Sequence, residues 1–180
     1  MTDLFRPADR VFVDESKSHG YWVVATASSV ASTSDSEKAL RSLLKPGQRR
    51  LHFKSERDSR RRKILSRMTE LDVRVGVWAT RRLPDKEARI RCLTSLTREA
   101  GRARVSDLII ERDESVTQAD RRIIAAALRA ESATGVHYEH VQPHEQPLLW
   151  VSDAVAWCCS NGGDWMRRVR PLVEDHIVRW

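Results

Sequence analysis

Short segments in which apolar residues alternate or cluster predict the β-strands of this protein. Residues 10–14 and 20–28 are rich in Val, Tyr, Trp and Thr, and a short polar turn containing Gly20 separates them. This pattern predicts an antiparallel hairpin. In DVRVGVWAT, residues 72–80, every second residue is apolar, which predicts a half-buried strand.

Apolar residues three and four positions apart predict helices between these strands. One helix is predicted over residues 33–45, with Ser34 or Ser36 as its N-cap, and a second, strongly basic helix over residues 55–71. Residues 49–54 between them form a short strand or an extended link. A third helix is predicted from Pro84–Asp85 to about Ala103, with these residues facing inward: Ile90, Leu93, Leu96 and Thr97.

Strand and helix patterns alternate in the second half of the chain. Strands are predicted over residues 106–113 and 136–141, and helices over residues 116–131 and 147–159. This order is typical of parallel strands joined by crossover helices. We therefore expect an α/β domain whose mixed sheet has an antiparallel start and a parallel finish. The last segment, residues 164–180, is predicted to be a short helix broken at Pro171.

Composition limits the possible function. The chain has 180 residues, 41% of them hydrophobic, which suits one domain with a single core. The 32 Lys and Arg residues outnumber the 25 Asp and Glu residues and give a net charge of +7, which favours a polyanionic partner such as DNA or RNA. No apolar run suits a membrane span and no signal-peptide pattern occurs, so we expect a cytoplasmic protein.

Acidic residues occupy places where carboxylates are uncommon. Asp14 ends the apolar run of the first strand, Glu111 follows Leu-Ile-Ile, and Asp153 stands within an otherwise apolar helix. Each has a structural alternative: a turn or strand-end cap for Asp14, an ion pair with an arginine for Glu111, and a helix N-terminal acid for Asp153. Strand ends and adjacent helices of open α/β sheets meet at one edge, however, which favours a shared site.

The order of these motifs resembles a known superfamily. VDES, HFKSE, LIIERD and PLLWVSDAVAW together look like the ribonuclease-H-like superfamily, and within it the bacterial family called domain of unknown function 3800. The resemblance spans about residues 10 to 160 and implies a single ribonuclease-H-like domain over residues 1–180, with a helical insertion at about 34–70. It also implies that Asp14, Glu111 and Asp153 form the acidic cluster that binds metal in this superfamily. Lys17 and His52 depart from the family pattern.

Such a cluster suits catalysis with Mg²⁺ or Mn²⁺, because carboxylates are the hard oxygen ligands that these ions prefer. In this scheme Asp14 bridges two ions, Glu111 and Asp153 each hold one, and Glu15 or Asp113 is an outer or fourth ligand. Asp113 is expected on the same side of its strand as Glu111. Lys54 is a candidate for neutralising charge on the reacting phosphate, with a surface role as the alternative.

The second predicted helix carries a basic stripe able to follow phosphates. The nucleic-acid-binding candidates are Arg57, Arg60, Arg61, Lys63 and Arg67. Interspersed acids allow the alternative of a solvated helix with internal ion pairs. Trp150 and Trp157 are better explained as core residues than as residues that stack on nucleic-acid bases. His137 and His140 do not have the spacing of a shared metal site.

The leading hypothesis from the sequence is a metal-dependent nuclease that hydrolyses phosphodiesters in DNA or RNA. The alternatives are a non-catalytic nucleic-acid-binding or toxin-type interaction module and a phosphatase-like hydrolase. The sequence leaves open the choice between RNA and DNA, the strandedness of the substrate and the oligomeric state. It contains none of the glycine-rich phosphate-binding, nucleophile-elbow or dinucleotide-binding motifs.

Overall fold

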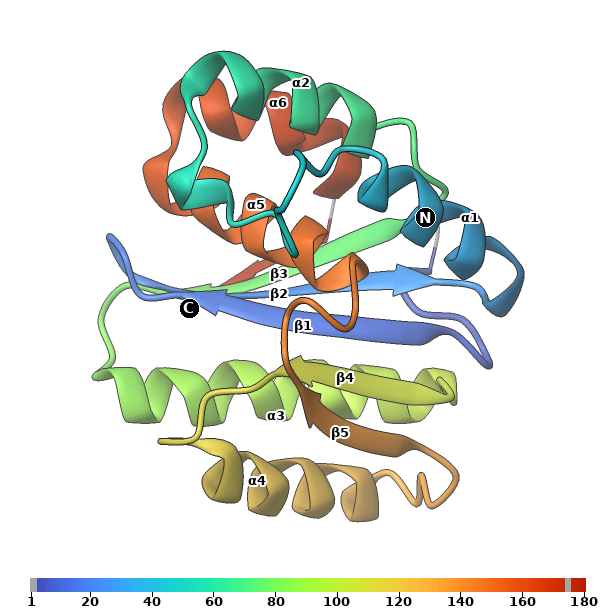
Figure 1. The fold of residues 1–180 in the computed structure, drawn as a ribbon. Helices are drawn as coiled ribbons and strands as arrows, with labels where there is room; N and C mark the ends of the chain where they lie inside the picture. Colours follow the sequence, from blue (N-terminus) through green and yellow to red (C-terminus); the bar gives the residue numbers. More distant parts are fainter. Residues whose placement is uncertain (1–2, 174–175) are drawn as a thin grey trace.

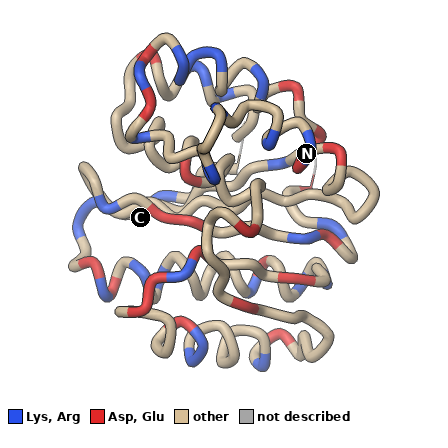
Figure 2. The backbone as a smooth tube through the Cα atoms, in the orientation of Figure 1, with Lys and Arg blue, Asp and Glu red and all other residues tan. Residues whose placement is uncertain are grey.

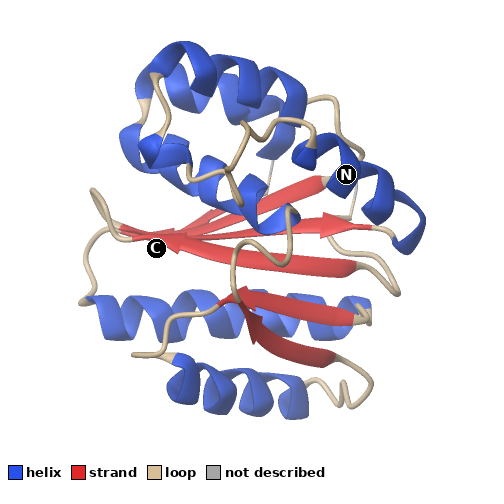
Figure 3. Ribbon diagram, in the orientation of Figure 1, coloured by secondary structure: helices blue, strands red, loops and turns tan. Residues whose placement is uncertain are grey.

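A six-stranded mixed sheet forms the centre of the protein (Figure 3). The computed structural model describes residues 3–173 and 176–180. The strands are β1 (Arg10–Ser16), β2 (Tyr21–Ser28), β3 (Arg74–Thr80), β4 (Asp107–Glu111), β5 (His137–Val141) and β6 (Ile177–Arg179). They lie side by side in the order β5-β4-β1-β2-β3-β6.

Helices cover both faces of this sheet. They are α1 (Val30–Arg41), α2 (Asp58–Met68), α3 (Asp85–Ala103), α4 (Thr117–Ala130), α5 (Leu148–Asn161) and α6 (Gly163–Val173), with a short 3-10 helix, η1 (Phe53–Ser55). One buried apolar core joins α1, α2, α5 and α6 to one face of the sheet, and a second joins α3 and α4 to the other, as Figure 1 shows. None of the described helices combines the length and apolar character needed to cross a membrane.

The strand pairing confirms the predicted mixed sheet. β1 pairs antiparallel with β2, as the hairpin pattern predicts, and β2 pairs antiparallel with β3. β4 lies parallel to β1, and β5 lies parallel to β4. The helices between these parallel strands provide the crossovers that the alternating pattern indicates.

Two predictions about the strands are wrong. β3 is buried on both faces rather than on one, because Val75 and Val77 enter the α5 core while Trp78 enters the α3 core. The chain also ends in a strand that the sequence pattern does not reveal. β6 has only three residues and runs parallel to β3 at the edge of the sheet, which is too short for a recognisable alternation.

The predicted helix boundaries also need correction. α1 begins at Val30, because the side chain of Ser29 accepts a hydrogen bond from the Ser32 backbone N–H at 3.1 Å; neither Ser34 nor Ser36 is the cap. α6 continues through Pro171 to Val173. Burial of its apolar residues in the α5 core keeps this last turn helical despite the hydrogen bond that proline removes.

The third helix has the predicted bounds, but one of its residues faces outward. Leu93, Leu96 and Thr97 are buried as expected, whereas Ile90 is 42% exposed. The predicted helical insertion at about 34–70 comprises most of α1, η1 and α2, whose buried apolar residues enter the α5 core: Leu40, Phe53, Ile64, Leu65 and Met68. Its status as an insertion stays a prediction.

Candidate active site: an acidic cluster between β1, β4 and α5

The pairing between the two central parallel strands, β1 and β4, ends before the acids do. The β1–β4 ladder runs from Arg10 and Asp107 to Val13 and Ile110 and stops there. Asp14 and Glu111 are therefore the first residues beyond the paired segment. Side chains alternate along a strand, and Phe12 and Ile109 belong to the α5 core, so both carboxyl groups point toward α5.

Hydroxyl groups hold α5 in place above these strands. The Ser152 hydroxyl donates a hydrogen bond to the Phe12 carbonyl oxygen at 2.8 Å and lies 2.7 Å from the Thr26 hydroxyl oxygen; both serine and threonine are fully buried. At the end of the helix, the Ser16 and Ser160 hydroxyls lie 3.5 Å apart. These contacts fix the register of α5 against β1, which brings the next residue, Asp153, to the two strand acids.

The structure thus brings Asp14, Glu111 and Asp153 together, and we refer to these three residues as the acidic cluster. Burial raises the pKa of Asp14 well above its ordinary value, and the charges of Glu111 and Asp153 and a hydrogen bond with Glu111 raise it further. Burial also raises the pKa of Asp153, with the charge of Glu111 acting in the same direction. The cluster therefore holds negative charges that repel one another in a partly desolvated place.

The loop that precedes η1 supplies the groups that oppose this repulsion. The Phe53 backbone N–H donates to Asp153 Oδ2 at 2.9 Å, and the Arg50 guanidinium lies 3.6 Å from Glu111 Oε1. His52 also favours the charged form of Asp153. The sequence patterns place Arg50 with the basic stripe that could follow phosphates, but they assign neither Arg50 nor His52 to the acidic cluster.

The chemistry of these donors fits a divalent cation. The charges of Glu111 and Asp153 raise the pKa of Asp14, and this repulsion is relieved when a cation takes the place of a proton; carboxylate oxygens suit Mg²⁺ or Mn²⁺. As the side chains stand, however, residues 3–173 and 176–180 contain no group of three or more His, Cys, Asp or Glu residues arranged to hold a metal. Binding therefore requires these side chains to turn toward a common point; at present Asp14 Oδ1 accepts a hydrogen bond from the Glu15 N–H and Asp153 Oδ2 accepts one from the Phe53 N–H.

Two predicted acids lie outside the cluster. Glu15 points to the opposite face, because neighbouring strand residues alternate, and there it accepts a hydrogen bond from Tyr21 and pairs with Arg89 and with Lys17. Asp113 follows the end of β4, so the alternation that places Glu111 does not extend to it. Its carboxylate accepts hydrogen bonds from the Ser115 hydroxyl at 2.6 Å and N–H at 2.9 Å, which hold its pKa below the ordinary value.

A small cavity connects these two groups of acids. It measures about 180 Å³ and lies between the ends of β1 and β4. Its walls include Asp14 and Glu111 from the acidic cluster and Glu15, Arg89 and Asp113 from the other side. Water or one oxygen-rich group fits such a volume.

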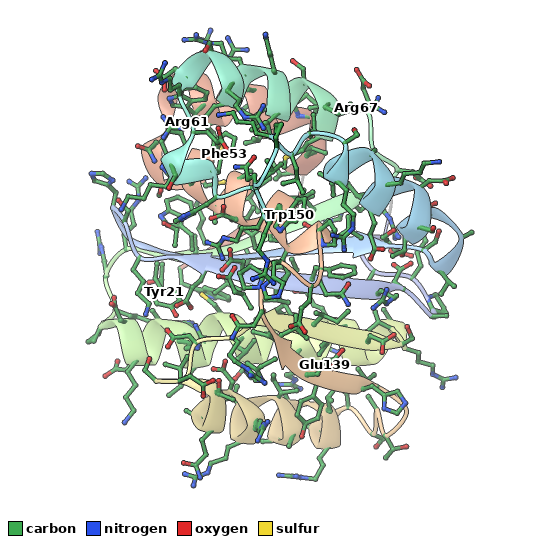
Figure 4. The ribbon with its side chains drawn as sticks, in the orientation of Figure 1. Tyr21, Phe53, Arg61, Arg67, Glu139 and Trp150 are labelled. Carbon is green, nitrogen blue, oxygen red and sulfur yellow. The ribbon has the colours of Figure 1, made fainter. Side chains whose placement is uncertain are left out.

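The basic residues of α2 form no continuous exposed stripe. Arg60 donates to the Leu43 carbonyl and pairs with Glu56 at 2.9 Å, so it ties α2 to the loop after α1. Arg61 lies 4.3 Å over the Trp157 ring, and Figure 4 shows it beside Phe53. Arg67 stands apart from them and pairs with Glu70. The predicted phosphate-binding roles of Arg60 and Arg61 therefore conflict with structural contacts that already occupy them.

The remaining predicted cations are exposed. Arg57, Lys63 and Lys54 make no ion pair within the part of the chain that the structure describes. Lys54 lies in η1, next to the Phe53 N–H that binds Asp153. Figure 2 shows that basic residues are frequent on α2 and also occur at the edge of the sheet where the chain ends.

Sequence reasoning missed a buried polar network on the other face. Asp120 is fully buried and accepts two hydrogen bonds from Arg89, at 2.6 and 2.7 Å, and one contact from His140 at 2.9 Å. Arg89 also donates to the Tyr21 hydroxyl at 3.0 Å. Burial by itself raises the pKa of Asp120, but the hydrogen bonds from Arg89 and His140 outweigh it and hold that pKa below its ordinary value. The network fastens α3 and α4 to β2 and β5.

Comparison with solved structures identifies the fold. The chain is similar to one in the structure of the PCNA:RNase HII complex from Archaeoglobus fulgidus, with a TM-score of 0.59 and 15% identity over 90% of this chain and 76% of that one. It is also similar to Bst-RNase HIII in complex with Mn²⁺, with a TM-score of 0.55 and 12% identity over 92% of this chain and 55% of that one. The protein therefore has a ribonuclease-H-like fold, as its sequence predicts. No family model and no curated protein matches the chain.

Proposed function

We propose that this protein is a metal-dependent nuclease that hydrolyses phosphodiester bonds in DNA or RNA at the acidic cluster. The observation that carries the proposal is the meeting of Asp14, Glu111 and Asp153 at the end of the central parallel strands, where burial and the charge of Glu111 raise the pKa of both Asp14 and Asp153. A purely structural acid is expected to be paired with a cation, whereas Asp14 faces two acids. The similar RNase HII and RNase HIII structures and the net charge of +7 support a nucleic-acid substrate.

In this proposal, different residues would bind the metal and the substrate phosphate. Asp14, Glu111 and Asp153 would hold Mg²⁺ or Mn²⁺, which supplies a more acidic bound water and stabilises charge on the leaving oxygen. Lys54 in η1 and Arg50 in the loop before it would bind the substrate phosphate. The narrower resemblance to the bacterial domain family 3800 is part of this proposal.

The experiment uses Asp153→Asn, which keeps the size of the side chain and removes its charge. Without metal, the variant should be as stable as the wild type or more so, because one repelling charge is gone. Cleavage of single-stranded and duplex RNA and DNA with Mn²⁺ should fall by at least about a hundredfold, as expected when a metal ligand is lost. Glu139→Gln, at an exposed acid on β5 that Figure 4 labels, is the matched control and should change neither property.

Two results would contradict the proposal. One is a wild type that neither cleaves any of these nucleic acids nor gains thermal stability from Mn²⁺. The other is a markedly destabilised Asp153→Asn variant, which would show that Asp153 is a structural acid. Nucleic-acid binding without cleavage would favour the alternative of a binding module with the same fold.

A further inference from the structure

A second pocket lies at the same edge of the sheet as the acidic cluster. It measures about 380 Å³, and its chemically distinctive walls are Trp22, Arg81, Arg82, Arg179 and Trp180; we refer to it as the arginine–tryptophan pocket. Its remaining walls are Ala79 and Thr80, so no acidic residue lines it. In Figure 1 the end of the chain lies beside the β1–β2 turn, in agreement with this set of residues.

The pairing of the strands places the Trp22, Ala79 and Arg179 walls of the pocket on the same face as the acids. Trp22 pairs with Ser16 of β1, two residues after Asp14, and Ala79 pairs with both Trp22 and Arg179. Trp22 and Ala79 belong to the α5 core, as Phe12 does, so they share the face toward which Asp14 points. The charge of Arg179 also acts to lower the pKa of the Cys159 thiol, against the larger effect of burial, so Arg179 lies near the end of α5.

The distance between the two places follows from the sheet order. β3 is two strands from β1 and β6 is three, which corresponds to roughly 10 and 14 Å at the usual strand spacing. At roughly 3.4 Å per stacked nucleotide, three or four nucleotides of a strand cover this span. A nucleic-acid strand whose phosphate lies at the acidic cluster can therefore reach the arginine–tryptophan pocket.

The charges in the pocket are not balanced by the protein. Arg81, Arg82 and Arg179 are exposed, and none of them makes an ion pair with any residue that the structure describes. Most of the protein's partly buried arginines, by contrast, have carboxylate partners, as Arg89 does with Asp120. Three guanidinium groups around one hollow repel one another, and an anion that enters it relieves this repulsion.

The pocket also offers an aromatic surface. Trp180 is 39% exposed, one of three large apolar residues exposed in the described parts of the chain, and its backbone N–H donates to the Ala79 carbonyl at 3.1 Å. This bond to β3 holds its backbone in place. Because side chains alternate along β6, the ring lies toward α3, where the Arg91 guanidinium is 5.0 Å from its centre, and it borders the pocket at the end of the sheet. The Arg81 guanidinium lies 6.0 Å from the centre of the Trp22 ring. Arginines beside an exposed aromatic ring are the usual means of binding single-stranded nucleic acid, since the ring stacks on a base while the cations bind phosphates.

We propose that the arginine–tryptophan pocket binds the single-stranded continuation of the nucleic acid beside the cleavage position, stacking a base on Trp180 and binding its phosphates with Arg81, Arg82 and Arg179. This inference rests on the proposed function for the position of the cut but not for the binding itself. It predicts that substrates with an unpaired strand are preferred, because the face of a base is available for stacking only outside a duplex.

The test measures binding of a short fluorescent oligouridylate, and of its DNA counterpart, to the full chain in EDTA by fluorescence anisotropy. Trp180→Leu should weaken binding by roughly fivefold to a hundredfold, the effect of losing one stacked base, with the salt dependence unchanged. Trp180→Phe keeps an aromatic ring and should retain most of the affinity. The double variant Arg81→Gln with Arg82→Gln should reduce the slope of log affinity against log salt by roughly 1.4, or 0.7 for each phosphate contact.

The matched control is the double variant Arg104→Gln with Arg129→Gln. It removes the same charge from two exposed arginines, one directly after α3 and one in the last turn of α4. If both double variants reduce the salt slope equally, the proposed binding at the pocket is wrong and only the general charge of the protein matters. Unchanged affinity in Trp180→Leu, or equal affinity for an oligonucleotide and its duplex, would also overturn it, as would a wild type that binds neither probe. Failure of the nuclease proposal would instead appear as absent cleavage in the presence of Mn²⁺. The binding assay is run in EDTA and does not depend on cleavage.

Discussion

Replacing Asp14 by Asn removes the carboxyl group whose charged form is disfavoured by burial and by the other two acids of the cluster. Burial and the charges of Glu111 and Asp153 raise the pKa of Asp14 well above its ordinary value, so its ionised form destabilises the fold when no metal is bound. The sign follows from this direction. The destabilisation is absent below the ordinary pKa of an aspartate, grows as pH rises above it, and is complete above the raised pKa.

The size of the effect follows from the burial of the charge. Burying a polar group without a compensating partner costs about 1–3 kcal/mol in mutational data. We therefore expect Asp14→Asn to increase the free energy of unfolding at neutral pH by about 1–3 kcal/mol without metal. The increase should vanish at acid pH, where the wild-type carboxyl group is protonated. With Mn²⁺ at about a hundred times its dissociation constant, the wild type should gain about 2.7 kcal/mol and the variant should not.

The assay is urea unfolding of both proteins across the pH range, with EDTA and with Mn²⁺. Glu139→Gln removes an exposed charge from β5 and should match the wild type in every condition. A variant that is less stable than the wild type at neutral pH in EDTA would refute the reasoning, because Asp14 would then be stabilised by a cation. Equal Mn²⁺ stabilisation of the wild type and the variant would show that Asp14 is no ligand.

Three further substitutions test other parts of the structure. Asp120→Asn leaves a buried cation unpaired and should cost about 3–5 kcal/mol in urea unfolding at neutral pH; the loss should shrink as pH falls through the lowered pKa of Asp120, and a pH-independent loss would contradict that pKa. Gly76→Ala places a methyl group 2.8 Å from the Trp78 ring and should lower the free energy of unfolding by about 1–3 kcal/mol, whereas an unchanged thermal melt would mean that β3 has room. Ser152→Ala leaves the buried Thr26 hydroxyl without its partner and should cost about 1–3 kcal/mol by the same measurement, with no loss if α5 is held otherwise.

The sequence predicts the central elements well because their signals are local. The hairpin, the parallel strands β4 and β5 and helix α3 follow from periodicity and from Pro84 before the helix. What sequence reasoning missed depends on contacts between distant segments. β6 forms because β3 offers an edge, and its three residues carry no pattern of their own. Ser29, rather than Ser34 or Ser36, caps α1 because β2 ends directly before it.

The acids of the site show the same distinction. Asp14, Glu111 and Asp153 interrupt apolar segments, so the sequence alone singles them out. Glu15 and Asp113 were assigned to the same cluster from their neighbours in sequence, but the alternation of side chains and the end of β4 place them elsewhere. The contacts of Asp153 with Phe53 and of Asp120 with Arg89 join distant segments, which no local pattern reveals.

Basic residues are the least predictable part of the site. Arg60 and Arg61 belong to a stripe that looks suited to phosphates, but in the folded protein Glu56 and the Trp157 ring already engage them. The exposed cations of the arginine–tryptophan pocket come from the loop after β3 and from the last strand, so they form a group only in the folded sheet. Spacing along the chain therefore shows where charges occur but not which of them remain free to bind a ligand.

The most direct test of the account is the position of Mn²⁺ in crystals soaked with MnCl₂, measured by anomalous diffraction. We expect an anomalous peak at the end of β1 and β4 that is coordinated by carboxylate oxygens of Asp14, Glu111 and Asp153. The peak should be lost in Asp14→Asn. A Mn²⁺ ion bound only elsewhere, or an acidic cluster that stays metal-free in the soaked crystal, would contradict the proposed metal site.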